Sequence, residues 1–259
     1  MSINFKILIV TIAILLNGSV AIAQLSESDT LKFQLKLSST GTWQKGNVEQ
    51  FTIRGKLELV TNATKNLVYK TQNNLLYQEF GDFKADNDIN SRNYVYWKPS
   101  KKIYPFAMAY FQTNYRRKID FRWFSGLGGT WQFYKDKNTI LKFSTALVYE
   151  NTDFLNNQFN QEEYNGSNNI SLWRSTIYVS GMHKMLEEKF KIYYTAYWQP
   201  ALGYSKNNRL QLDTGIEMPL WKDFNFLVQY TFNNEQVVVK NVKNIDRILT
   251  FGLSYQLKK

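Results

Sequence analysis

The chain has 259 residues, a formal net charge of +11, an aromatic content of 16% and no cysteine. The lack of cysteine excludes a disulfide-stapled secreted scaffold, thiolate metal sites and cysteine nucleophiles. Lys and Arg are spread along the whole length without a dense run, which argues against a nucleic-acid partner. Abundant Tyr, Phe and Trp are typical of strands and of membrane–water interfaces.

The first 23 residues have the composition of a secretory signal peptide. Lys6 is the only charge there, an apolar run spans Ile7 to Leu16, and residues 21–23 read Ala-Ile-Ala before Gln24. An apolar run of about 10 residues is too short to cross about 30 Å of hydrocarbon, so a cleaved signal is favoured over a membrane anchor. We therefore expect residues 1–23 to be removed and residues 24–259 to form one exported domain.

Apolar and polar residues alternate soon after this stretch. In LKFQLKL, residues 31–37, Leu31 and Phe33 share one face, and Lys32 and Lys36 share the other. Successive side chains of a strand point to opposite faces, so the pattern predicts a strand with one apolar and one polar face. The same pattern recurs in chain order near residues 51–59, 67–80, 92–98, 103–115, 119–134, 141–150, 170–182, 190–199, 209–218, 223–232 and 245–257.

This repetition predicts about 12 strands, each long enough to cross a bilayer when tilted. Residues 92–98 and 170–182 alternate least regularly, which leaves about 10 strands as the alternative. With the N-terminus in the periplasm, short turns fall on that side, at residues 61–66, 99–102, 135–138, 183–189 and 220–223. Longer links fall on the other side, at residues 81–92, 151–169 and 233–244. Short periplasmic turns and longer extracellular loops are typical of outer-membrane barrels.

A soluble barrel of the lipocalin type, with apolar side chains inside, would show the same alternation. Two features favour the inverted arrangement: more segments than the 8 strands of lipocalins, and Trp and Tyr recurring near segment ends on the apolar face. Arg or Lys facing lipid near the midplane costs about 2–4 kcal/mol, so Arg54, Lys56 and Glu58 should point inward. The fold class predicted is all-β: a single closed antiparallel transmembrane β-barrel with a polar lumen.

Residues 91–151 carry a resemblance to a known family. They read as a strand, a short turn, a strand, an Arg122-containing strand with a Gly126-Leu127-Gly128 step, and a strand ending in Tyr149 and Glu150. This resembles the salt-induced outer-membrane protein family, whose molecular function is unassigned. The resemblance implies an integral barrel in the outer membrane of a Gram-negative bacterium and brings no catalytic residues. The C-terminal SYQLKK departs from the terminal aromatic residue of many such barrels.

Catalytic and metal-binding patterns are weak in this sequence. The single histidine, His183, is expected in a periplasmic turn, away from a Ser or Asp partner. Asp213 and Glu217, four residues apart, would suit a glycosidase-like acid pair, but salt bridges with Arg209, Arg174 or Lys191 are favoured. The glycines at 126–129 lack the following Lys-Ser/Thr of a phosphate loop. We expect no enzyme, no cofactor and no metal site.

The lumen is therefore the predicted site. The alternation places ten basic and five acidic residues inside, Lys32, Lys36 and Lys70 among them, which predicts a basic interior with a weak preference for anions. Large inward residues such as Tyr193 and Tyr197 could close it. The candidate selectivity residues are Arg54, Lys56, Glu58, Asp120, Arg122, Lys142, Glu150, Arg174, Lys191, Arg209, Asp213 and Glu217.

These observations lead to one first hypothesis and two alternatives. The first is a monomeric outer-membrane barrel, either a narrow passive channel or a structural, stress-related envelope protein. The alternatives are an outer-membrane enzyme acting on lipid and a surface protein that binds through the loop at residues 151–169. The expected partners are outer-membrane lipid, the barrel-assembly machinery and small anionic solutes.

Overall fold

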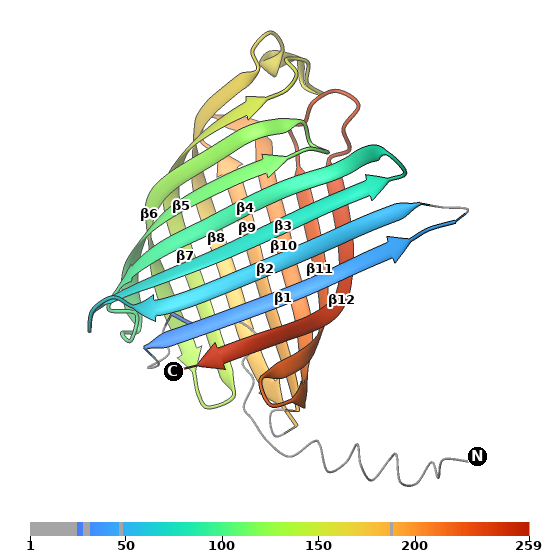
Figure 1. Ribbon diagram of the computed structural model, residues 1–259. Helices are drawn as coiled ribbons and strands as arrows, with labels where there is room; N and C mark the ends of the chain where they lie inside the picture. Colours follow the sequence, from blue (N-terminus) through green and yellow to red (C-terminus); the bar gives the residue numbers. More distant parts are fainter. Residues whose placement is uncertain (1–24, 28–31, 47–48, 187–188, 259) are drawn as a thin grey trace, which may run out of the picture.

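A computed structural model describes residues 25–27, 32–46, 49–186 and 189–258. The predicted signal peptide, residues 1–23, lies outside the described residues. Within them, twelve antiparallel strands close into one barrel in which each strand pairs with its sequence neighbours and β1 pairs with β12 (Figure 1). The strands are β1 (Phe33–Gln44), β2 (Gln50–Asn62), β3 (Leu67–Phe80), β4 (Phe83–Trp97), β5 (Ile103–Asn114), β6 (Ile119–Lys135), β7 (Thr139–Phe154), β8 (Asn169–Met185), β9 (Phe190–Ala201), β10 (Tyr204–Trp221), β11 (Phe224–Glu235) and β12 (Ile245–Lys258). The predicted fold class and strand number are confirmed.

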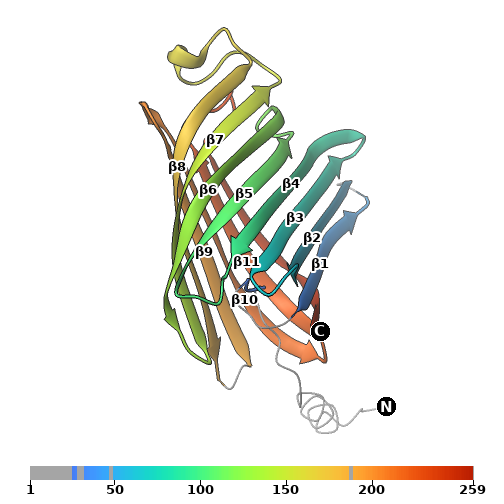
Figure 2. The same cartoon turned by 90° about the vertical axis from the view of Figure 1, so that its left-hand side faces the viewer.

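The two ends of the barrel differ in their connections. The C-terminus and the connections β2–β3, β4–β5, β6–β7, β8–β9 and β10–β11 lie at one end, which we call the turn end. The β7–β8 connection, which contains a 3-10 turn at Glu162–Tyr164, lies at the opposite end, which we call the loop end (Figure 2). The described residues contain no helix long and apolar enough to cross a membrane.

The prediction of a long loop at residues 81–92 was wrong. β4 begins at Phe83, and Gly81 and Asp82 alone connect it to β3. Gly81 has φ of +56°, a left-handed conformation that glycine adopts without steric cost. The acidic and amide residues of this segment continue the polar face of β4, because Asp86 and Asp88 are both buried. The long connections at the loop end are therefore those between β7 and β8 and between β11 and β12.

Apolar side chains cover the outside of the barrel and polar ones fill the inside. On β7, Phe143 and Leu147 are exposed, whereas Lys142 and Glu150 are buried. Leu127 is 71% exposed at the middle of β6, where only a lipid environment would favour it. Slipping any such strand by one residue would turn its charges toward hydrocarbon, so the alternation fixes the register of the whole sheet.

Gly126 and Gly128 allow inward-facing side chains of neighbouring strands to pack closely. A Cβ at Gly128 would lie 2.6 Å from Phe106 Cζ and 2.4 Å from the Thr145 carbonyl oxygen, and one at Gly126 would lie 2.7 Å from Val148 Cγ1. Gly129, one residue further on, has nothing within 4 Å of its Cβ position. The glycines on the inner face of β6 therefore serve packing in the lumen.

We expect Gly128→Val to destabilise the barrel by about 1–3 kcal/mol or to prevent its folding, because the added atoms would overlap Phe106 and the β7 backbone. The matched variant Gly129→Val adds the same atoms toward lipid and should leave stability unchanged. Urea unfolding of the protein refolded in detergent, followed by the mobility of unheated samples on gels, measures both. Equal midpoints for the two variants would contradict the packing role.

Candidate functional site in the barrel lumen

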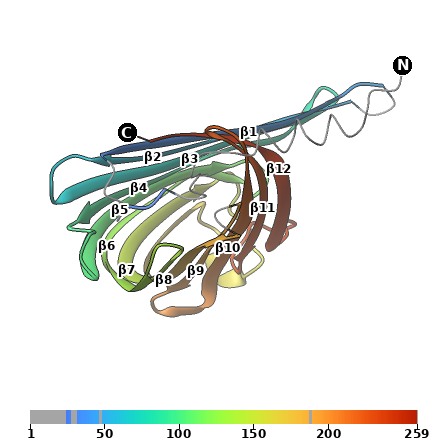
Figure 3. The same ribbon diagram turned by 90° about the horizontal axis from the view of Figure 1, so that it is seen from below.

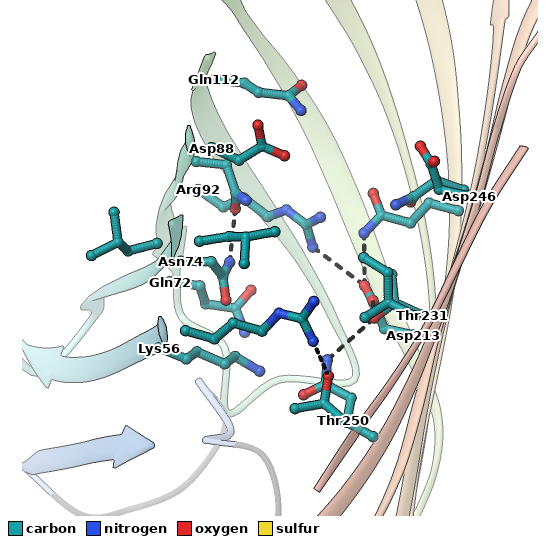
Figure 4. A pocket seen from close by; sticks show the side chains of 18 of the residues that line it. Lys56, Gln72, Asn74, Asp88, Arg92, Gln112, Asp213, Thr231, Asp246 and Thr250 are labelled. Carbon is teal, nitrogen blue, oxygen red and sulfur yellow. Dashed lines mark hydrogen bonds and ion pairs between the residues drawn. The ribbon is translucent and has the colours of Figure 1, made fainter. Parts of the chain in front are cut away.

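A polar cavity of about 240 Å³ lies inside the barrel. Its lining comes from β1–β5 on one wall and from β9–β12 on the other, and Figure 4 shows side chains of the two walls facing each other across the cavity. Most of these groups are charged, amide or hydroxyl side chains. The side chains labelled in the figure are Lys56, Gln72, Asn74, Asp88, Arg92, Gln112, Asp213, Thr231, Asp246 and Thr250.

Two arginines reach across this cavity from one wall to the other. Arg92 on β4 lies 3.8 Å (Nη1 to Oδ2) from Asp213 on β10, and its guanidinium stacks near the rings of Tyr110 and Tyr197. Arg54 Nη1 on β2 donates a hydrogen bond to Thr250 Oγ1 on β12, at 3.3 Å. Sequence reasoning missed Arg92 because the facing of residues 92–98 was left ambiguous. On β4, Tyr94 and Tyr96 are buried and Val95 and Trp97 are exposed. Arg92, two residues before Tyr94, therefore shares the inward face.

A buried ion-pair network closes the loop end beside the cavity. Glu150 on β7 accepts hydrogen bonds from Arg174 (2.9 Å) and from Arg209 (2.7 and 2.6 Å). Arg122 donates two 3.0 Å hydrogen bonds to Glu235, forming a bidentate pair. Carboxylates and guanidinium groups removed from water are stable only in such paired arrangements. The sequence-predicted residues Arg122, Glu150, Arg174 and Arg209 are brought together here.

The two long connections cover this network. Phe159 of the β7–β8 connection forms an isolated antiparallel bridge with Val239 of the β11–β12 connection. Both pack with Ile119, Phe154 and Val237 in an apolar cluster at the loop end. Residues 155–168, the central part of the loop considered for surface binding, thus contact a second loop through apolar side chains.

Residues 25–27, which precede β1, occupy the turn end of the lumen. Leu25 is 1% exposed and packs in a cluster that includes Tyr94 and Tyr104. Glu27 accepts hydrogen bonds from Tyr104 Oη (2.8 Å) and Lys142 Nζ (2.7 Å), and Lys70 Nζ donates to the Leu25 carbonyl oxygen at 2.9 Å. Burial alone would raise the pKa of Glu27, but Lys142 and Lys70 outweigh it and hold this pKa well below its usual range. We call residues 25–27 the plug.

A layer of tyrosines separates the plug from the cavity. Tyr94 and Tyr197 approach to 3.4 Å between their hydroxyl oxygens, and Tyr178 stacks on Tyr197 at 4.4 Å between ring centroids. A small cavity of about 40 Å³ lies on the plug side of this layer, between the plug and β7–β8. The lumen therefore has two barriers on the turn side, the tyrosine layer and the plug.

The remaining predicted residues have definite places. Lys56 pairs with Glu58 (2.7 Å), and Glu217 pairs with Lys36. Lys191 is fully buried on β9. Three more predicted residues are already placed: Lys142 at the plug, and Arg54 and Asp213 at the cavity.

Asp120 is a correction to the predicted lumen set. The pairing of β6 with β7 passes from Ile119↔Phe154 directly to Phe121↔Asp153, so Asp120 is the extra residue of a β-bulge. The bulge breaks the alternation, so Ile119 turns inward and Asp120 is exposed. Lys32, just before β1, is exposed as well.

The interior is more evenly charged than the alternation predicted. Within the described residues, the cavity is lined by five basic side chains, Arg54, Lys56, Arg92, Arg116 and Arg117, and four acidic ones, Asp88, Asp213, Glu235 and Asp246. Sequence reasoning missed Asp88 and Glu235 because they lie in segments read as loops, and Asp246 because the facing of the last strand was read only from Leu249 onward. At the cavity, the basic interior expected from ten basic and five acidic residues is close to balanced.

His183 lies on β8, which extends to Met185, and not in a turn as expected. Its ring stacks with Tyr194 at 5.8 Å, and Nδ1 lies 3.3 Å from Thr139 Oγ1. No group of three or more His, Cys, Asp or Glu among the described residues is arranged to hold a metal ion.

Comparison with known proteins supports the fold and supplies a family. The chain is similar to the NanC porin, with 9% identity over 87% of this chain and 100% of that chain, and a TM-score of 0.52. It is also similar to the translocator domain of the autotransporter NalP from Neisseria meningitidis, with 12% identity over 97% of this chain and 94% of that chain, and a TM-score of 0.47. It is similar as well to the COG4313 outer membrane channel from Pseudomonas putida F1, with 11% identity over 94% of this chain and 99% of that chain, and a TM-score of 0.46. At these identities the likeness concerns the fold alone.

No curated protein matches the chain. Residues 39–257 match the model of the family described as protein of unknown function, DUF481. That description does not mention salt, so the salt-induced character implied by the resemblance stays a prediction. Since the match spans nearly all of the barrel, the chain belongs to the DUF481 family of proteins of unknown function.

Proposed function

We propose that the protein is a narrow, weakly anion-preferring channel for small solutes in the outer membrane of a Gram-negative bacterium. The observation that carries this proposal is a polar cavity inside a transmembrane barrel, separated from the turn end by a three-residue plug and a tyrosine layer. The plug is held by hydrogen bonds to Glu27 and to the Leu25 carbonyl and by packing of Leu25, so it can leave without unfolding any strand. The protein is exported by its signal peptide, inserted by the barrel-assembly machinery, and works as a monomer surrounded by lipid.

The preference for anions follows from the cavity walls. Five basic and four acidic side chains line the cavity, and the guanidinium groups of Arg54 and Arg92 reach Thr250 and Asp213 on the opposite wall. A lumen with a small excess of positive charge favours anions weakly, because each fixed charge attracts counter-ions within about 10 Å at 0.1 M salt. Acidic neighbours limit this bias and leave cations able to pass.

A structural, stress-related envelope protein is the second candidate function. The paired interior and the two barriers on the turn side support it, because a barrel that never opens gains stability from filling its lumen with satisfied ion pairs. Conductance across planar bilayers separates the two candidates: discrete ohmic channels support the first, and silence under all conditions supports the second.

Charge reversal in the cavity tests the ion preference. We expect Arg54→Glu combined with Lys56→Glu to change the preference from anions to cations, since the cavity would then carry more acidic than basic groups. Reversal potentials in a salt gradient across a planar bilayer measure this preference. Lys45→Glu, on the exposed connection after β1, makes a charge change outside the lumen and should leave it unaltered. An unchanged preference in the double variant would contradict the assignment of these residues to the conduction path.

Acidification tests the plug. The pKa of Glu27 is lowered in the docked state, so the plug is stabilised above the ordinary glutamate pKa of about 4.3 and loses this stabilisation as the pH falls through the lowered pKa. We therefore expect the open probability to rise as the pH is lowered below about 4. Glu27→Gln should raise it about tenfold at neutral pH, since a hydrogen bond to a charged group contributes about 1.5–3 kcal/mol.

Single-channel recording on the wild type and two variants provides the measurement. Glu49→Gln removes an exposed carboxylate at the loop end and is the matched control, expected to gate like the wild type. Glu27→Gln channels should also lose the response to acid. A variant that gates like the wild type at both pH values would rule out the plug as the gate.

A further inference from the structure

The seam between β1 and β12 is paired over only part of its length. Six residue pairs join the strands, from Gln34↔Lys258 to Ser39↔Leu253. Beyond this point β1 continues to pair with β2 as far as Gln44, and β12 continues to pair with β11 as far as Ile245. Thr40–Gln44 of β1 and Ile245–Gly252 of β12 thus have a strand partner on one side only. Figures 1 and 3 show the two strands diverging here, with the β1–β2 hairpin extending away from β12.

This opening lies at the level of the membrane hydrocarbon. On the β12 side, Leu249 and Phe251 point outward and are 55% and 57% exposed. On the β1–β2 side, Ile53 and Phe51 are exposed beside it, and Trp43 near the tip is 79% exposed. Unpaired backbone groups facing lipid are strongly unfavourable, so a polar group or a ligand must meet them from within.

Arg54 is the side chain that stands in the gap. It lies on β2 opposite Thr40 and reaches Thr250 on the far edge, 3.3 Å from Nη1 to Oγ1. Its Nε is buried and has no hydrogen-bond partner among the described residues. Asp86 on β4, an acid near Arg54 in space, is already paired with Arg116, 2.6 Å from Nε to Oδ2. The guanidinium therefore retains donor capacity for an anion, and a carboxylate matches its planar fork.

Directly below the gap, toward the turn end, an apolar groove of about 630 Å³ runs along the outside of the barrel. Leu37, Leu57, Leu75, Ile89 and Leu253 line it. The groove and the lumen cavity adjoin along β1–β3, where both are lined by Ser38, Ser39, Gly55, Lys56, Asn74 and Leu75. An apolar channel on the lipid side thus leads to a cationic group at the edge of the lumen.

We propose that the β1–β12 seam is a lateral binding site for a single-chain anionic amphiphile, a long-chain fatty acid, taken up from the outer leaflet. The acyl chain lies in the groove and the carboxylate accepts hydrogen bonds from Arg54 in the gap. This orientation matches that of a lipid in the outer leaflet, whose head group lies toward the loop end. Binding here does not require a conducting lumen, so the site and the proposed channel function can fail independently.

The chain offers a direct way to prevent the seam from widening. A Cβ at Gly252 would lie 3.4 Å from the Thr40 Cβ, close to the separation of about 3.5–4.5 Å found in disulfides. The sequence contains no cysteine, so Thr40→Cys with Gly252→Cys can form only the designed bond. Because these two positions already touch, oxidation fixes β1 and β12 at this separation and prevents the seam from widening to admit a carboxylate, and reduction restores this freedom in the same molecules.

The test uses the full-length mature protein refolded in phosphatidylcholine vesicles and a palmitate probe that carries a photoactivatable diazirine. We expect saturable labelling of β1, β2 and β12. Unlabelled palmitate should compete with the probe, whereas palmityl alcohol, which lacks the carboxylate, should not. Oxidation of the double-cysteine variant should reduce labelling at least tenfold, and a thiol reductant should restore it. Arg54→Gln should weaken the apparent affinity about tenfold, whereas Arg92→Gln, deeper in the cavity, should not change it.

Several outcomes would overturn the proposal. Labelling spread evenly over the outer face, or equal before and after oxidation, would mean that the probe reports only surrounding lipid. Equal competition by a two-chain phosphatidylglycerol would assign the groove to a phospholipid. Cross-links between two barrels that oxidation abolishes would show that a second copy pairs with the free edges. The mobility of unheated samples on gels establishes that each variant is folded before labelling.

Discussion

Hydrogen bonding of the backbone within hydrocarbon is the constraint on which the rest of the structure depends. Each strand of a barrel must pair on both sides, because lipid offers no substitute donors or acceptors. Here the ladder of twelve strands meets this requirement over most of the barrel, but the β1–β12 seam carries only six pairs, all in its turn-end half. The same place brings an apolar groove, an arginine and the lumen cavity together. Incomplete closure of the sheet is thus a feature with chemical consequences.

Closure of the sheet into a barrel imposes a second constraint, on where charged side chains can lie. A barrel that turns its apolar side chains outward must place its charges inside, where water is limited, and charges there are stable only in pairs or networks. The interior accordingly divides into the Arg–Glu network at the loop end, the central cavity, and the plug held by Lys70, Lys142 and Tyr104. Within the described residues, the central cavity holds about 240 Å³ of space, against about 40 Å³ beside the plug. Because the plug is short and held by side-chain contacts and not by strand pairing, the turn end can be regulated separately from the barrel wall.

Much of the fold could be predicted because the strand has a period of two, and the penalty for exposing charge to lipid links each polar residue to one face. Glu58, Glu150 and Arg174 could therefore be placed inside from alternation alone. Alternation failed where the backbone departs from regular pairing. The bulge at Asp120 turned that residue outward, and the polar stretch Asp86–Asp88, which looked like a loop, continues β4. The acidic residues of the cavity were underestimated for the same reason.

The sequence by itself determined the class of the protein, the number of strands and the side of the wall on which most charges lie, since each of these depends on local periodicity. Only the tertiary structure decided which charges meet, that residues 25–27 enter the lumen, and where the seam stays unpaired. These features depend on the stagger between strands that are far apart in sequence. Lys142 and Glu27, or Arg54 and Thr250, become neighbours only when the sheet closes on itself with a particular shear, and no pattern within a single strand specifies it.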